Sequence, residues 1–221
     1  MVDPLRQQAV EHFSRIIPQQ FDETGKKERY SKVFGDDSSF PHPFELVSLF
    51  RQCQLTRFLP WAYYMACKEG FEVLLSGGIS RQNQVIHMSE EDTRVALRGW
   101  KQLRDGTLNI RRTTVMSRAP NCESGPCNDM LRMAWLDTVF HHVRSDSLER
   151  WKPLNLLVRY QEITSGPSSL TLQGITPCQM CAAFWLKEEV QRRRKVWDTL
   201  PLTFGLPPWE ILLKEEDVGS G

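Results

Sequence analysis

The chain has 221 residues, of which 40% are hydrophobic and 25% are charged. These proportions are typical of a globular protein and exclude a disordered chain, a collagen-like repeat and a coiled-coil rod. Because 28 Lys and Arg residues oppose 27 Asp and Glu residues, the net charge is only +1, which excludes a polybasic nucleic-acid-binding protein.

Apolar side chains at helical spacing predict four helices in the first part of the chain. They cover residues 10–21, 44–58, 61–70 and 71–75. Pro18 interrupts the first of these helices, whereas Pro60 suits the first turn of the third. Residues 24–39 are polar and contain two glycines, so a loop is expected there. The adjacent Gly77 and Gly78 should end the fourth helix.

In the middle of the chain, the sequence pattern predicts an extended segment followed by a helix. Residues 81–88 alternate loosely between apolar and polar side chains, which is typical of a strand. Ser89 and Asp92 are spaced as a capping box, in which Ser89 accepts from helix amides and Asp92 reaches back. The helix that they start should stop near Gly106, because glycine disfavours a helix interior.

Two further helices are predicted in the last third of the chain. One starts at Asn128 or Asp129 and presents an apolar face, and the other starts between Thr176 and Cys181 and ends at Pro201. Residues 145–174 show no clear preference, and a short segment over 207–213 closes the fold. The expected fold class is therefore mainly α, an irregular multi-helix domain with little or no β structure.

The expected organisation is a helical region over 1–118, a Cys-pair helical region over 119–213 packed on it, and a disordered tail over 214–221. The N-terminus carries charges where a signal peptide needs an apolar run. The most apolar stretch, 59–67, has about half the length of a membrane-spanning helix, so no membrane association is expected. We expect a cytoplasmic or nuclear protein whose six cysteines are reduced.

Four of the cysteines form two closely spaced pairs, a C-x4-C at Cys122 and Cys127 and a C-x2-C at Cys178 and Cys181. Each pair precedes a predicted helix, whose free amides and dipole stabilise a thiolate. Zinc is commonly bound by four such ligands in a tetrahedron with Zn–S bonds of about 2.3 Å. These residues therefore predict a structural zinc site that clamps the two helices, with sulfurs about 4 Å apart.

Two other interpretations of these cysteines stay open. In one, they are small buried residues without a metal. In the other, Cys178 and Cys181 perform thiol–disulfide exchange, since alternating residues 169–173 precede the C-x2-C and a helix follows it. This second interpretation expects the pair to lie far from Cys122 and Cys127, and the βαβ pattern of a thioredoxin-like fold is not found in the sequence.

The remaining cysteines and the histidines indicate no further site. Cys53 and Cys67 lie on apolar helix faces and are predicted to be core residues. His141 and His142 are neighbours on a predicted helix, where their side chains point about 100° apart. They are therefore not expected to bind one ion together.

The densest basic run is Arg-Arg-Arg-Lys over 192–195. Glu188 and Glu189 stand four residues before Arg192 and Arg193, which predicts a solvated helix face with internal ion pairs. Binding of nucleic acid at this run is the alternative, and it predicts an affinity that falls steeply with salt. No P-loop, dinucleotide-binding glycine motif, nucleophile elbow or zinc-protease motif occurs in the sequence, so no enzyme is expected.

Several different short motifs are distributed along most of the chain. They are Ala-Val-Glu-His-Phe-Ser-Arg-Ile-Ile-Pro over 9–18, Glu-Leu-Val-Ser-Leu-Phe over 45–50, the capped helix over 89–100, the two cysteine pairs, and Trp-Asp-x-Leu-Pro, Phe-Gly-Leu and Trp within 197–209. In this order they resemble the region C-terminal to the BTB core in fungal BTB/POZ-domain proteins. The resemblance extends from about residue 9 to 213, and the BTB core itself is absent from this sequence.

This resemblance implies a non-enzymatic helical protein-interaction domain, the post-BTB half of an adaptor that binds one or more protein partners. In the superfamily, the BTB fold supplies dimerisation and often docks to cullin ubiquitin ligases. A ubiquitin-ligase scaffold is therefore expected only of a longer form that contains a BTB domain. Thiol–disulfide exchange at Cys178 and Cys181 and a nucleic-acid-binding zinc module are the alternative functions.

Overall fold

The structure is a computed structural model that describes residues 4–21, 41–114, 119–120, 122, 127 and 178–214. The chain forms two compact units, one of Met1–Leu103 with Trp197–Gly221 and the other of Arg104–Val196. The boundaries expected after residues 118 and 213 stay a prediction. The last segment of the chain belongs with the N-terminal helices, because Trp197 lies against Trp61 with ring centroids 6.1 Å apart.

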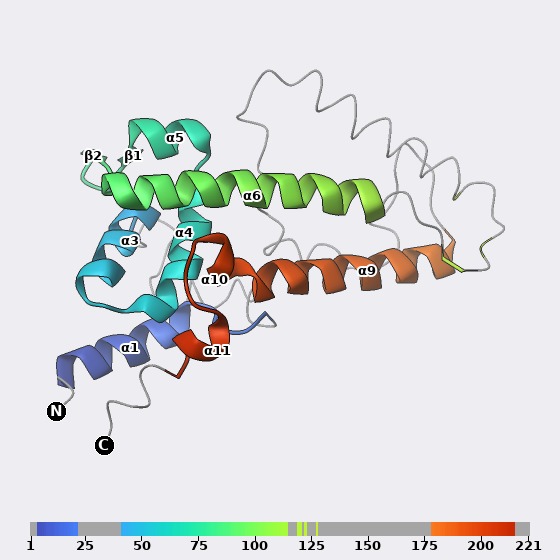
Figure 1. The fold of residues 1–221 in the computed structure, drawn as a ribbon, viewed down its shortest axis with the longest axis horizontal. Helices are drawn as coiled ribbons and strands as arrows, with labels where there is room; N and C mark the ends of the chain where they lie inside the picture. Colours follow the sequence, from blue (N-terminus) through green and yellow to red (C-terminus); the bar gives the residue numbers. More distant parts are fainter. Residues whose placement is uncertain are drawn as a thin grey trace. The chain divides into compact units, whose positions relative to one another are not determined.

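The described residues are mainly helical and contain one sheet of two short strands, which confirms the expected fold class (Figure 1). The elements are α1 (Pro4–Ile16), α3 (Pro43–Gln52), the 3-10 helix η3 (Thr56–Phe58), α4 (Leu59–Lys68), α5 (Phe71–Ser76), β1 (Gly78–Ile79), β2 (Val85–Ile86), α6 (Glu90–Thr114), α9 (Gln179–Asp198), α10 (Leu200–Thr203) and α11 (Trp209–Leu212). No described helix is both long enough and apolar enough to cross a membrane.

The core of the first unit lies where α3 packs against α4. Its largest fully buried side chains are aromatic and aliphatic and come mainly from these helices: Phe44, Phe50, Phe58, Trp61, Tyr63 and Tyr64. The helix expected over 44–58 ends at Gln52 instead, because Gln54 has a φ of 54° and the Leu55 amide turns back to the Phe50 carbonyl. A short 3-10 turn then leads into α4, where Pro60 occupies the first turn as predicted.

The expected strand over 81–88 is only partly formed. Val85 and Ile86 pair antiparallel with Gly78 and Ile79, in the register Gly78 with Ile86 and Ile79 with Val85. The residues between the strands form a turn that Asn83 closes with a φ of 58°. The predicted alternation therefore produces a hairpin of two short strands.

Helix α6 starts at the predicted capping box but continues beyond its predicted end. The Ser89 hydroxyl accepts the Asp92 amide at 3.1 Å, as expected for this cap. The helix runs through Gly106 to Thr114, so the predicted stop at Gly106 is wrong. One interior glycine costs only about 0.5–1 kcal/mol relative to alanine, which the flanking helix-forming residues offset.

Three aromatic residues hold the C-terminal segment in the first unit. The rings of Trp197 and Trp209 stack with centroids 4.8 Å apart, and the Trp209 indole donates to the Trp197 carbonyl at 2.8 Å. Phe204 stacks on Tyr63 at 5.1 Å. Pro201 does not simply end the last long helix, since α9 stops at Asp198 and Pro201 lies in the first turn of α10.

Several expectations fall outside the described residues. They concern the loop over 24–39, the helix that starts at Asn128 or Asp129, the region 145–174, the histidines His141 and His142, and the tail over 214–221, of which only Lys214 is described.

Candidate metal centre

The side chains of Cys122, Cys127, Cys178 and Cys181 converge in the second unit. Their four Sγ atoms all lie within 4.8 Å of one another, and those of Cys122 and Cys178 are 3.6 Å apart. This confirms the predicted convergence of two pairs that lie far apart in the sequence. All four cysteines are free thiols, because a disulfide would need an S–S distance of about 2.05 Å.

The start of α9 positions the second pair. Cys178 stands directly before the helix, and the amide of Cys181 donates to the Cys178 sulfur at 3.4 Å. This is the arrangement that a serine or threonine makes at a helix N-cap, with sulfur in place of oxygen. The local sequence therefore both starts the helix and aims two sulfurs at the same point.

Backbone donors connect the two pairs. The amide of Cys178 donates to the Cys127 sulfur at 3.2 Å, and the backbone of Ala119 hydrogen-bonds the Cys181 sulfur. The amide of Cys122 in turn donates to the Ala119 carbonyl at 3.1 Å, which closes the turn before the first pair. Hydrogen bonds of this kind stabilise sulfur as thiolate, the form that binds metals.

The two sulfurs of the C-x2-C pair differ in acidity. The backbone hydrogen bond from Cys181 lowers the pKa of the Cys178 thiol to about 7. Burial raises the pKa of the Cys181 thiol to about 12, because a thiolate is poorly solvated there. A nearby cation would reverse this second shift, since a coordinating thiol is deprotonated outright.

Three of the four clustered cysteines are shielded from solvent. Cys122, Cys127 and Cys181 are buried, Cys178 is half-buried, and Phe184 packs against them from the second turn of α9. Apolar surroundings of this kind limit the access of water to a metal site.

The four residues fit a tetrahedral metal ion. A tetrahedron with Zn–S bonds of about 2.3 Å places its sulfurs about 3.8 Å apart, close to the spacing found between Cys122 and Cys178. Four protein ligands also fill the coordination sphere and leave no position for a substrate, which is typical of a structural site. The cluster can therefore hold a metal ion, and its four protein ligands are typical of a structural metal site instead of a catalytic one.

The other two cysteines lie elsewhere. Cys67 is buried as predicted, and its thiol contacts the Ala96 carbonyl at 3.3 Å. Burial raises the pKa of Cys67 well above its usual range. Cys53 is exposed, so its predicted core position is wrong. The reason is that α3 ends at Gln52, which places Cys53 beyond the apolar stripe of the helix.

The basic run over 192–195 is not a continuous exposed patch. Glu188 and Arg192 form the predicted ion pair at 3.2 Å. Arg193 is only 4% exposed, which contradicts a fully solvated face over this run. Because Arg193 is buried, this stretch is poorly suited to binding several phosphates of a nucleic-acid backbone.

Sequence reasoning missed the groups that complete the cluster. Ala119 has no reactive side chain and contributes through its backbone, and no sequence signal marks such a donor. Phe184 lies within the last predicted long helix, and no pattern in the sequence relates it to the sulfurs. The comparisons with known proteins found no match to a family model, a curated protein or a solved structure.

Proposed function

We propose that this protein is a non-enzymatic helical interaction module in which Cys122, Cys127, Cys178 and Cys181 bind one structural zinc ion. The observation that carries this proposal is the convergence of all four sulfurs to within 4.8 Å. Four soft thiolates in tetrahedral arrangement select zinc or an iron–sulfur cluster among common metals. A single ion matches the observed sulfur spacing, because it needs its ligands about 3.8 Å apart.

The zinc ion would act as a cross-link within the second unit. It would join the turn around Cys122 and Cys127 to the start of α9 and would neutralise part of the thiolate charge. Because a preformed site rarely exists in an unfolded chain, the free energy of metal binding adds to the stability of the folded second unit.

The same geometry argues against thiol–disulfide exchange. That function expects the Cys178 and Cys181 pair to stand apart from the other two cysteines, whereas the Cys122 sulfur lies 3.6 Å from that of Cys178. A thiol held by a metal and shielded by Phe184 is a poor nucleophile in comparison with an exposed redox cysteine.

The interaction role rests on the resemblance of residues 9–213 to the post-BTB region of fungal BTB/POZ-domain proteins. Such a module would bind a protein partner, and ubiquitin-ligase scaffolding would require a BTB domain in a longer form. The amphipathic helices of the first unit support this role because they form a rigid scaffold that can present a surface.

Metal analysis of the purified chain tests the zinc site. Protein purified without added metal should contain about one zinc ion per chain, and cobalt replacement should give the visible absorption of a tetrahedral thiolate site. Cys127→Ser should release the metal and lower the melting temperature. Cys53→Ser is the matched control, since it removes an exposed cysteine outside the cluster and should leave the metal content unchanged.

Three results would contradict the proposal. The first is a protein that is fully folded but contains no zinc and binds none when it is added. The second is reduction of insulin disulfides that depends on Cys178, which would favour thiol exchange. The third is binding of DNA or RNA that weakens steeply with salt, which would favour the nucleic-acid interpretation.

A further inference from the structure

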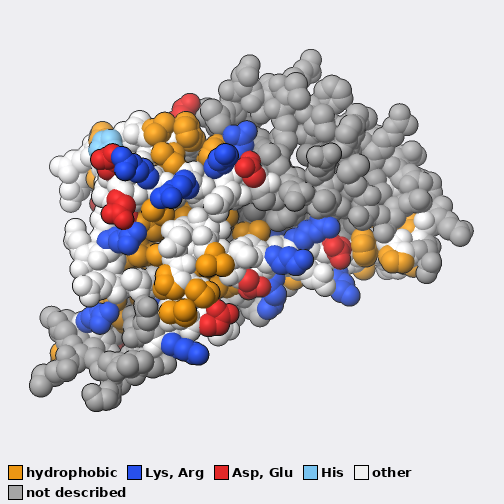
Figure 2. Space-filling model, viewed as in Figure 1, with side chains coloured by type: hydrophobic (Ala, Val, Ile, Leu, Met, Phe, Trp, Pro, Cys, Tyr) orange, Lys and Arg blue, Asp and Glu red, His pale blue; other side chains and the backbone are white. Residues whose placement is uncertain are grey.

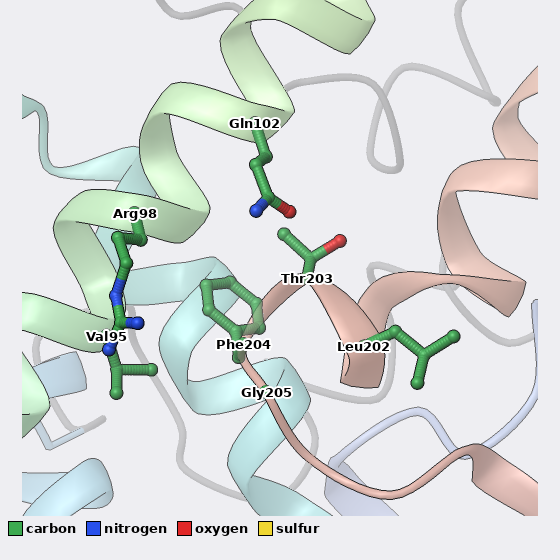
Figure 3. Close-up of a pocket in the computed structure, with 7 residues that line it drawn as sticks. All are labelled: Val95, Arg98, Gln102, Leu202, Thr203, Phe204 and Gly205. Carbon is green, nitrogen blue, oxygen red and sulfur yellow. The ribbon is translucent and has the colours of Figure 1, made fainter.

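A cavity of about 250 Å³ opens in the first unit between α6 and α10 (Figure 3). Its lining residues are Val95, Arg98 and Gln102 from α6, and Leu202, Thr203, Phe204 and Gly205 from the C-terminal segment. This volume lies just below the range of pockets for drug-sized ligands and suits one or two side chains of a peptide.

The floor of this cavity is a fixed aromatic ring. Phe204 is buried, and its ring stacks on that of Tyr63 with centroids 5.1 Å apart. On the other side the ring approaches α6 at Gly99, where a β-carbon would lie 2.1 Å from Phe204 Cε1. The ring can therefore reach the helix only because this position is glycine, and the cavity is preformed.

Two hydrogen-bond donors stand one helical turn apart on one wall. Among the described residues that line the cavity, Arg98 is the only charged one, and its Nε donates to the Arg94 carbonyl at 3.4 Å. Within the described part of the chain, no hydrogen bond or ion pair engages the Nη groups of Arg98 or the amide of Gln102. Figure 3 shows the Gln102 amide pointing toward Thr203 and Phe204, and the Arg98 guanidinium beside Val95.

The opposite wall offers an acceptor and an apolar surface. The Thr203 hydroxyl donates to the Thr199 carbonyl at 3.1 Å, so its oxygen is left to accept from a ligand. Leu202 is 58% exposed and offers an apolar surface at the edge of the cavity. The cavity thus combines donors for an anion, an acceptor for an N–H group and an apolar rim.

The surrounding charge favours an anionic ligand. Arg94, Arg98 and Lys101 are exposed and lie on one face of α6, with Arg94 paired to Glu90. Figure 2 shows Lys and Arg side chains, with acidic ones among them, over α6 beside a hydrophobic area. The Arg98 guanidinium matches a carboxylate, which can accept two parallel hydrogen bonds from it.

We propose that this cavity binds a carboxylate side chain of a partner protein, presented next to an apolar residue of the same peptide. The carboxylate would accept from Arg98, a peptide N–H would donate to Thr203, and the apolar neighbour would lie against Leu202. This inference rests on the proposed interaction function, for which it names the chemistry of the partner.

Titration of the labelled full-length protein with matched short peptides tests the site. The probes are acetyl-Glu-Leu-amide, acetyl-Gln-Leu-amide and acetate, each followed by the NMR signals of the Gly205 amide and the Gln102 side chain. The Glu peptide should shift both signals with saturation. The affinity for the Gln peptide should be lower by a factor of about ten or more, because this peptide loses a charge-assisted hydrogen bond.

Two variants separate the pocket from general charge. Arg98→Gln should reduce affinity for the Glu peptide about tenfold. Arg94→Gln is the matched control, because it removes a positive charge one turn away that does not line the cavity, and it should change the affinity less than about twofold at physiological salt.

Four outcomes would overturn the inference: no shift with the Glu peptide at millimolar concentration, equal affinity for the Glu and Gln peptides, shifts with acetate as large as those with the peptide, or equal losses in the two variants. Each outcome concerns the first unit alone. The zinc measurement on the second unit is independent of it, so a failure of one proposal is distinguishable from a failure of the other.

Discussion

The phenolic hydroxyl of Tyr63 donates a hydrogen bond to the buried carboxylate of Asp92, and this bond joins α4 to the first turn of α6. The same carboxylate accepts from Arg51 Nε at 3.0 Å and from the Ser89 hydroxyl at 2.6 Å. Burial, together with the bond to Asp92, raises the pKa of Tyr63 above its usual range, so the tyrosine remains a donor at every physiological pH. One carboxylate therefore holds three helices in a common arrangement.

Removal of this carboxylate should destabilise the first unit strongly. We expect Asp92→Ala to lower the free energy of unfolding by about 2–4 kcal/mol, because the buried Tyr63 hydroxyl and the Arg51 guanidinium lose a charged acceptor. Urea denaturation followed by circular dichroism measures this loss. Glu91→Ala is the control, since Glu91 is exposed beside Asp92 and should change stability by less than about 0.5 kcal/mol. Equal effects of the two substitutions would contradict the central role of Asp92.

Gly99 should not tolerate a side chain. An alanine in a helix interior normally adds about 0.5–1 kcal/mol of stability over glycine. At this position its β-carbon would lie 2.1 Å from the Phe204 ring, which is held by its stack on Tyr63. We therefore expect Gly99→Ala to cost about 1–3 kcal/mol, measured by urea denaturation. A gain in stability would show that Phe204 does not pack on α6, and the exposed Lys101→Ala should be nearly neutral.

The stability of the first unit should decline in mild acid because of His42. Its Nδ1 accepts the Phe44 amide at 3.2 Å at the start of α3, which requires a neutral ring. Burial lowers the pKa of His42, although Glu69 and Glu45 oppose the shift. A lowered pKa means that the folded protein binds fewer protons than the unfolded chain. The contribution of His42 is therefore complete above about pH 6.5 and is lost as the pH falls below that value.

Measurement of the melting temperature between pH 7.5 and 5 tests this expectation, because histidine titrates over roughly this range. His42→Asn keeps a side chain that can cap the helix but does not titrate. The variant should lose less stability than the wild type as the pH falls. Parallel curves for the two proteins would remove His42 as the cause of the decline.

Thiol reactivity should distinguish the three environments of the cysteines. Cys53 is exposed and should react at once with a thiol reagent, whereas Cys67 is buried with a raised pKa and should react slowly. The four clustered cysteines should be protected while metal is bound. All six should react in denaturant with a chelator present. Cys53→Ser should abolish the fast reaction, and a fast reaction that persists in this variant would place another thiol at the surface.

Local sequence determined the presence of several helices and the cap of one of them. The spacing of apolar residues marked α1, α4 and α5, and the short interval between Ser89 and Asp92 marked the start of α6. These features depend on residues three or four positions apart, whose geometry a helix imposes on its own. The cysteine pairs were also visible, because ligand spacing within each pair is a local property.

Only the tertiary structure decided which of these local features meet. It brought Cys122 to within 3.6 Å of Cys178, brought Tyr63 and Arg51 to Asp92, and buried Arg193 within a run that looks solvated in the sequence. Such contacts join residues far apart along the chain, so the local spacing of side chains does not reveal them. Periodicity within one helix holds no information on which face of another helix lies against it.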